Sequence, residues 1–250
     1  MPSAPCATAS FRADTPPRGA LLAQLALALG GFSLGTGEFA SMGLLPNVAC
    51  DVHVTVPIAG HMISAYALGV VVGAPLLATI FARTGRRAML VGLMVFFASA
   101  NVLCAVASSY GVIVAARFLA GLPHGAYFGI ASLVAASLVP VDKRAQAVAR
   151  MMLGLSSANI VGVPFATWVG QAAGWRAAFV VVAAIGIATA LLCRLALTST
   201  PAPDDASPLT ELGALRRGQV WLTLGIAAIG FGGVFAVYSY ITPMLTERPA

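Results

Sequence analysis

Four long stretches of this sequence contain no aspartate, glutamate, lysine or arginine: residues 88–116, 118–141, 151–175 and 218–246. Each stretch is long enough to cross a bilayer core of roughly 30 Å as an α-helix that rises about 1.5 Å per residue. Of the 250 residues, 59% are hydrophobic and 9% are charged, whereas a soluble domain has about 25% charged residues. The composition therefore excludes a soluble domain and a disordered chain, and it predicts an integral membrane protein.

The apolar runs predict an all-α fold with seven transmembrane helices. Their expected ranges are 20–45, 57–82, 88–107, 110–139, 147–171, 176–197 and 219–244. The runs are continuous, whereas the strands of a membrane barrel alternate over segments of about ten residues. The first run is longer than the core of a cleaved signal peptide, about 7–15 residues, so we expect it to persist as the first helix.

Basic residues predict the orientation of these helices. Eleven of the 14 lysine and arginine residues flank the N-terminus or the connections 2–3, 4–5 and 6–7, whereas Arg176 and Arg248 flank the opposite side. The positive-inside rule then places the N-terminus and those connections in the cytoplasm. The net charge of +6 needs no nucleic-acid partner, because the basic residues stand at the ends of apolar runs.

The longest polar connection divides the chain unequally. It spans residues 198–218, where Ser207 and Pro208 could cap and start a short surface helix. Six predicted helices precede it and one follows. The expected organisation is a cytoplasmic tail (1–19), a six-helix bundle (20–197), a cytoplasmic linker (198–218) and the first span of an incomplete second bundle (219–250).

Glu38 and Arg117 are the charged residues expected deep inside the apolar spans. A charge at mid-membrane costs about 2.5–3.5 kcal/mol on insertion scales, so such residues usually face a cavity or a partner. Each lies seven residues from the predicted outer end of its helix, so the equal depth permits an ion pair or a shared hydrogen-bond network. One interpretation is that Glu38 gains and loses a proton during transport while Arg117 tunes it. The other is a permanent ion pair that fixes helix packing.

Several uncharged polar residues are further candidates. His124 lies two turns deeper than Arg117 and could relay protons, contact a substrate or donate a hydrogen bond between helices. Candidates for lining a substrate cavity are Met42, Tyr127, Asn159, Tyr238 and Tyr240. The four cysteines lack a CxxC pair, and His53 and His61 lack the partners of a metal site, so no metal or cofactor is expected.

Small residues recur along three predicted helices at positions where backbones can approach closely. The positions are Ala65, Gly69 and Gly73 on the second helix, Gly121, Gly125 and Gly129 on the fourth, and Gly154, Ala158, Gly162, Ala166 and Gly170 on the fifth. Pro164 removes an amide donor from the fifth helix and should bend or loosen it. The small residues of this helix therefore serve either ordinary bundle packing or the movement of a gating helix.

Signatures of enzymes are missing from the sequence. We find no HExxH, GxSxG, P-loop or strand-linked GxGxxG motif. The chain is therefore not expected to be an enzyme, and the driving force for transport would come from an ion gradient or from the solute itself.

Four stretches resemble a known family. They are GTGEFASMGLLPNVA (35–49), ISAYALGVVVGAPLLATIFARTGRRAML (63–90), RFLAGLPHGAYFG (117–129) and GLSSANIVGVPFATWVGQAAGWRAAF (154–179). Together they resemble the major facilitator superfamily, and within it the drug and sugar:proton antiporter branch, close to arabinose-efflux-permease-like proteins. The final span, GFGGVFAVYSYITPMLT (230–246), is similar to the first helix of the family's second half.

The resemblance implies two six-helix halves, each built from inverted three-helix repeats, that rock around a central substrate site. It implies proton coupling at Glu38 with Arg117 as its network partner, and a hinge at Pro164 with Gly154 and Gly162. The 2–3 loop motif matches at Gly85, Arg86 and Arg87. It departs from the family where an aspartate is usual, because this chain has Ala82, and its opening glycine is Ala78.

The expected function is therefore secondary active transport in the bacterial inner membrane, as proton-coupled efflux of a drug or sugar. The expected partners are a small-molecule substrate, protons and the bilayer, and the full-length protein is expected to be a monomer. Alternatives are a proton–solute symporter, or a non-transporting membrane scaffold if the natural chain ends at residue 250. The sequence does not identify the substrate.

Overall fold

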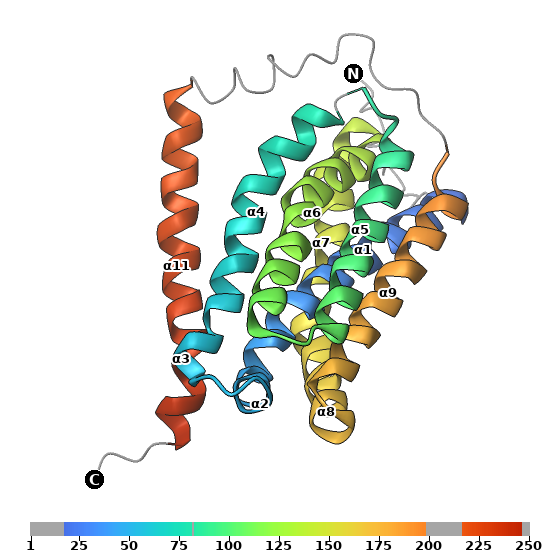
Figure 1. Ribbon diagram of the computed structural model, residues 1–250. Helices are drawn as coiled ribbons and strands as arrows, with labels where there is room; N and C mark the ends of the chain where they lie inside the picture. The colour runs from blue at the N-terminus through green and yellow to red at the C-terminus, as the bar shows by residue number, and fades with distance from the viewer. Residues whose placement is uncertain (1–17, 82, 199–216, 247–250) are drawn as a thin grey trace, which may run out of the picture.

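The computed structural model describes residues 18–81, 83–198 and 217–246, and these ranges form helices joined by short connections (Figure 1). Seven helical spans in these ranges are long and apolar enough to cross a membrane, which confirms the predicted number and the all-α class. Ala82, Arg248, most of the predicted tail and nearly all of the 198–218 linker, with Ser207 and Pro208, lie outside the described residues. The side chains of Ala78, Tyr238 and Tyr240 also lie outside the described part.

The order of the helices follows the predicted order of the spans. They are α1 (Arg18–Gly43), α2 (Leu45–Asp51), α3 (Val56–Ala59), α4 (His61–Ile80), α5 (Arg86–Val106), α6 (Tyr110–Ser137), η1 (Val141–Lys143), α7 (Arg144–Ser157), η2 (Ala158–Gly162), α8 (Val163–Ala173), α9 (Trp175–Ala196) and α11 (Gly218–Thr246).

The fifth span is not one continuous α-helix, contrary to the single helix predicted over 147–171. It begins with the 3-10 turn η1 and continues as α7, the π-helical segment η2 and α8. Pro164 lies in the first turn of α8, where its missing amide donor is tolerated. The π-helical turn before it has wider i→i+5 hydrogen bonding, which is typical of functional sites in helices.

The packing of the first six spans has an internal symmetry. The most extensive contacts join α4 to α6, α5 to α9, α1 to α7, α5 to α6 and α1 to α9. These are the span pairs two–four, three–six, one–five, three–four and one–six. When spans one, two and three are exchanged with spans four, five and six, in that order, the same set of pairs results. The bundle is therefore built from two equivalent sets of three helices, as the family resemblance implies.

Glycines permit the closest helix contacts in the bundle. A side chain at Gly121 of α6 would collide with the Tyr66 carbonyl of α4, and one at Gly154 of α7 would collide with the Ala28 carbonyl of α1. Gly129 differs from these, because the space around its backbone is open. The predicted close contact along the fourth span is thus wrong at Gly129.

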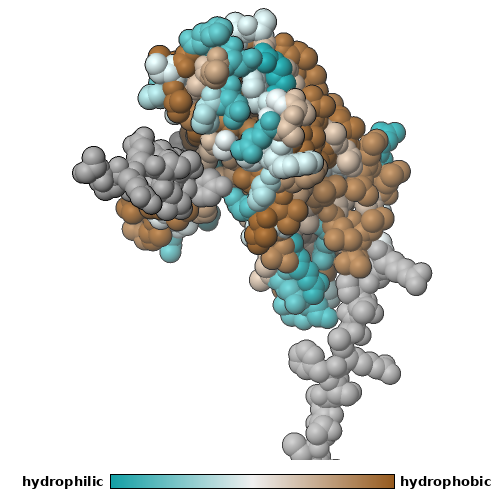
Figure 2. Space-filling view, turned by 90° about the horizontal axis from the view of Figure 1, so that it is seen from below, coloured by the Kyte–Doolittle hydropathy of each residue, from teal (hydrophilic) through white to brown (hydrophobic). Residues whose placement is uncertain are grey.

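The flanks of the bundle are apolar and its interior is tightly packed. Figure 2 shows hydrophobic residues over much of the sides, with hydrophilic residues gathered in separate patches. The helix α11 stands apart from the six-span bundle (Figure 1), and the side chains described along it are mostly exposed. Phe235 of α11 stacks on Phe39 of α1 with ring centroids 5.6 Å apart.

A polar cluster joins three connections at the end of the bundle that carries α2. The Asp51 carboxylate accepts hydrogen bonds from Arg176 Nη1 and from Trp175 Nε1, the latter at 3.2 Å. Arg176 Nη2 also donates to the Ala107 carbonyl at 3.1 Å. The hydrogen bonds from Arg176 and Trp175 lower the pKa of Asp51 below its ordinary value.

Candidate functional site

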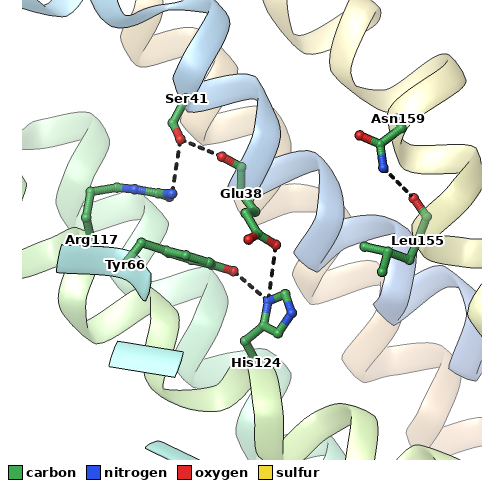
Figure 3. A network of polar contacts seen from close by, with 7 residues as sticks. All are labelled: Glu38, Ser41, Tyr66, Arg117, His124, Leu155 and Asn159. Carbon is green, nitrogen blue, oxygen red and sulfur yellow. Dashed lines mark hydrogen bonds and ion pairs between the residues drawn. The ribbon is translucent and has the colours of Figure 1, made fainter. Parts of the chain in front are cut away.

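Three polar side chains from three spans meet inside the bundle. Glu38 comes from α1, Tyr66 from α4 and His124 from α6 (Figure 3). The Tyr66 hydroxyl and His124 Nδ1 are hydrogen-bonded at 2.9 Å, and Nδ1 lies 3.8 Å from Glu38 Oε2. His124 therefore lies between a phenol and a carboxyl group.

This arrangement gives His124 Nδ1 two possible partners. When Nδ1 carries no proton, it accepts the hydrogen bond from the Tyr66 hydroxyl. When Nδ1 is protonated, it becomes a donor, and both the Tyr66 oxygen and the Glu38 carboxylate are possible acceptors. The distance to Glu38 exceeds hydrogen-bond length, so a direct proton transfer needs a small approach of the two groups or one bridging water.

Arg117 belongs to the same network. It is 0% exposed, and its Nη2 donates to Ser41 Oγ at 3.2 Å. Its guanidinium carbon lies 4.3 Å from the centroid of the Tyr66 ring, a cation–π distance. Nε and Nη1 find no hydrogen-bond partner among the described residues.

Glu38 and Arg117 are joined through other residues rather than by direct contact. Ser41 Oγ accepts from Arg117 and donates to the Glu38 carbonyl at 2.6 Å, while Tyr66 contacts Arg117 with its ring and His124 with its hydroxyl. Within the described ranges, the ion-pair contacts are those of Glu38 with His124 and of Asp51 with Arg176. Of the two arrangements that equal depth permitted, the structure has the shared network.

The predicted cavity residues lie in different environments. Tyr127 is buried and its hydroxyl donates to the Leu27 carbonyl at 3.0 Å, so it packs α6 against α1 inside the bundle rather than facing an open cavity. Asn159 donates to the Leu155 carbonyl on its own span at 3.2 Å and stands away from the network (Figure 3). Met42 is half-buried one turn beyond Glu38 on α1.

The predicted gating residues lie at two places. Gly154 and Gly162 pack the fifth span against α1, with Gly162 facing the Thr36 hydroxyl, and Pro164 lies two residues after Gly162. Gly85 precedes α5, and Arg86 and Arg87 form its first turn. In the part of the chain that the structure describes, neither arginine forms an ion pair, and no cluster of three metal-ligating side chains occurs.

Sequence reasoning missed Ser41 and Tyr66 as site residues. Both stand inside motifs that carry the family resemblance, yet neither is charged. The available signals were the spacing of Ser41 one turn after Glu38, which places both on one face of α1, and a phenol inside an apolar span, where a buried hydroxyl needs a partner.

The fold and the site together define a class of protein. A bundle of apolar spans built from two sets of three helices encloses an acid, a histidine and an arginine, and this combination is typical of secondary transporters. The comparison with family models gives the same class, because the model described as Major Facilitator Superfamily matches residues 27–248.

Individual proteins show the same relationship. The chain is 46% identical over 221 residues to "Inner membrane transport protein YdhP" of Escherichia coli (strain K12), covering 88% of this chain and 57% of that protein. It is 36% identical to "Chloramphenicol resistance protein" of Streptomyces lividans, covering 88% and 57%. A crystal structure of a bacterial homologue of the human lysosomal transporter Spinster matches with a TM-score of 0.69, 18% identity, and coverage of 92% of this chain and 56% of that one.

The chain belongs to the Major Facilitator Superfamily, a family of multi-pass membrane transporters and not of enzymes. It spans little more than half the length of the curated relatives that it matches.

Proposed function

We propose that the protein is a secondary active transporter that exports a small organic solute from the cytoplasm in exchange for protons, by alternating access in the bacterial inner membrane. The observation that carries this proposal is the network of Glu38, His124, Tyr66, Ser41 and Arg117 inside the spans. The name of one relative, an inner membrane transport protein, supports transport in that membrane, and the name of another, a chloramphenicol resistance protein, fits the export of an organic solute. The N-terminus faces the cytoplasm in this proposal, following the positive-inside rule.

Glu38 is the proton carrier in the proposed mechanism. A carboxyl group that is enclosed by apolar spans but has a guanidinium in the same network can exist in two protonation states. The proton reaches it from His124, whose Nδ1 lies between Glu38 and Tyr66. Arg117 stays charged throughout, held by the Ser41 hydroxyl and the Tyr66 ring, and favours the release of the proton from Glu38.

The fifth span is the proposed hinge. Its π-helical segment interrupts the regular hydrogen bonding at residues 158–162, and Pro164 follows without an amide donor. Gly154 and Gly162 allow this span to lie directly against α1, which carries Glu38. Movement of the span would therefore change the surroundings of the proton carrier.

Substitution of Glu38 by glutamine tests this proposal. The complete gene is expressed in a pump-deficient host, and candidate drugs and sugars are screened for reduced accumulation. Inside-out vesicles are then energised to acidify their interior, and uptake of the solute is measured. The wild-type protein should accumulate the solute, whereas Glu38→Gln should lose the proton-driven component, because an amide has a similar shape but carries no titratable proton.

The matched control is Asp142→Asn, which removes an exposed acid from the 4–5 connection outside the network and should leave uptake unchanged. Proton-driven uptake that persists in Glu38→Gln removes Glu38 from the mechanism. Uptake that occurs only when the proton gradient is reversed, with an alkaline vesicle interior, would indicate symport instead of antiport.

A further inference from the structure

The burial of Tyr66 determines the direction of its hydrogen bond to His124. Tyr66 is 2% exposed, so its hydroxyl cannot donate to bulk water. Among the described residues, the hydrogen-bond partner of this hydroxyl is His124 Nδ1, at 2.9 Å. If Nδ1 carried the proton and donated it to the phenol oxygen, the buried O–H group would keep no acceptor, which is unfavourable. The geometry therefore favours Tyr66 as the donor and Nδ1 as the acceptor.

This direction selects one form of the neutral imidazole. A neutral imidazole has one protonated nitrogen and one acceptor nitrogen, so the proton of His124 lies on Nε2 when Nδ1 accepts from Tyr66. The choice matters to Glu38, whose Oε2 lies 3.8 Å from Nδ1. A bare Nδ1 offers the Glu38 carboxylate no donor, in agreement with a separation greater than a hydrogen bond.

Packing holds the phenol in this position. The Arg117 guanidinium carbon lies 4.3 Å from the centroid of the Tyr66 ring, and the His124 ring stands at 90° to it with centroids 5.8 Å apart. A side chain at Gly121 of α6 would come within 2.2 Å of the Tyr66 carbonyl, so α4 lies directly against the helix that carries His124. The hydroxyl points at the imidazole from this fixed base (Figure 3).

We propose that Tyr66 is a positioning residue that keeps neutral His124 in the form protonated at Nε2, and that it thereby controls the passage of protons between His124 and Glu38. The assignment of the imidazole form stands on the geometry alone. Its consequence for transport rests on the proposed function, in which Glu38 is the proton carrier.

The transfer step shows what the hydroxyl does. In protonated His124 both ring nitrogens carry a proton, and the Glu38 carboxylate and the Tyr66 oxygen are the possible acceptors for Nδ1–H. When Glu38 approaches, the Nδ1–H bond breaks and an O–H bond forms on Glu38, which leaves a neutral imidazole and a neutral carboxylic acid. The Tyr66 hydroxyl then donates to the vacated lone pair of Nδ1. Because Glu38 would have to return its proton to that lone pair, the hydroxyl opposes the reverse step.

Nitrogen-15 NMR of the protein produced from its complete gene, labelled at histidine, tests this proposal. The signals of His124 are identified by their loss in His124→Gln. At about pH 9, well above the ordinary pKa of histidine, about 6.5, the wild-type protein should show an unprotonated Nδ1 and a protonated Nε2. Tyr66→Phe keeps the ring beside Arg117 but removes the donor. The proton should then move to Nδ1, where the Glu38 carboxylate accepts it, and the Nδ1 signal should change from the unprotonated to the protonated range.

The matched control is Tyr127→Phe, which removes another buried hydroxyl three residues from His124 on the same helix. That hydroxyl donates to the Leu27 carbonyl, so the Nε2-protonated form should persist. The proposal is overturned by a Tyr66→Phe protein that keeps this form, or by an equal change in Tyr127→Phe. A protonated Nδ1 in the wild-type protein also rejects it, and this result does not require any variant to fold. No solute or gradient is present, so failure here is distinct from failure of proton-coupled export in the Glu38→Gln vesicle assay.

Discussion

At the scale of single residues, Arg117 shows how a buried charge is held without a carboxylate in contact. Its guanidinium is divided between the Ser41 hydroxyl and the face of the Tyr66 ring. In a direct ion pair with Glu38, neutralising either group would leave the other charge buried without a partner, which is costly. The indirect arrangement leaves the Glu38 carboxyl beside His124, where a change of its protonation state need not break the contacts of Arg117.

Asp51 allows a prediction about stability and pH. The hydrogen bonds from Arg176 and Trp175 lower its pKa in the folded protein, so between the folded and unfolded pKa values the unfolded state binds more protons. The stabilisation is then complete above the unfolded pKa, about 3.9, and is lost as the pH falls through the folded value. Thermal unfolding of Asp51→Asn should begin at a lower temperature than that of wild type at pH 7.

The difference between the two proteins should shrink as the buffer is acidified towards pH 3, because protonated Asp51 no longer pairs with Arg176. Melting curves of the purified protein at several pH values provide the measurement. A difference of constant size across this range would mean that the Asp51 carboxylate contributes nothing through its charge.

At the scale of elements, the fourth span shows that equal spacing of glycines does not mean equal roles. Gly121 lies against the Tyr66 carbonyl of α4, whereas Gly129, two turns further along α6, has open space around it. The substitution Gly121→Ala should therefore separate α4 from α6 and destabilise the fold by about 1–3 kcal/mol, as overpacking does. It should also disturb the network, since Tyr66 contacts both Arg117 and His124.

Gly129→Ala is the matched control on the same helix, and it should leave stability unchanged or slightly increased, because alanine is the better helix former. Unfolding in mixed detergent micelles measures both variants. Equal destabilisation by the two substitutions would show that the contact with α4 does not determine the effect.

At the scale of the whole molecule, the sequence predicted the spans well because each is a long apolar run bounded by charged or polar residues. The same signal could not predict the π-helical segment at 158–162, which depends on local hydrogen bonding. Charge identified Glu38 and Arg117, but not Ser41 and Tyr66, because an uncharged side chain becomes part of a site only through its neighbours in the fold. Tyr127 was expected to line a cavity, because the sequence does not reveal that its hydroxyl reaches the Leu27 carbonyl.

The orientation of the whole chain in the membrane is tested through Cys50. It is exposed in α2, between the first and second spans, whereas Cys104 and Cys193 are buried in the bundle. The excess of basic residues on the opposite side predicts that Cys50 lies outside the cytoplasm. In spheroplasts, a membrane-impermeant maleimide should label the protein in a Cys6→Ser background, and Cys50→Ser should abolish that labelling.

Lys143→Cys, added to the protein without Cys6 and Cys50, reports on the 4–5 connection and should react only after permeabilisation. The reverse pattern, with position 143 labelled in sealed spheroplasts and Cys50 protected, would invert the orientation and with it the direction of proton-coupled export.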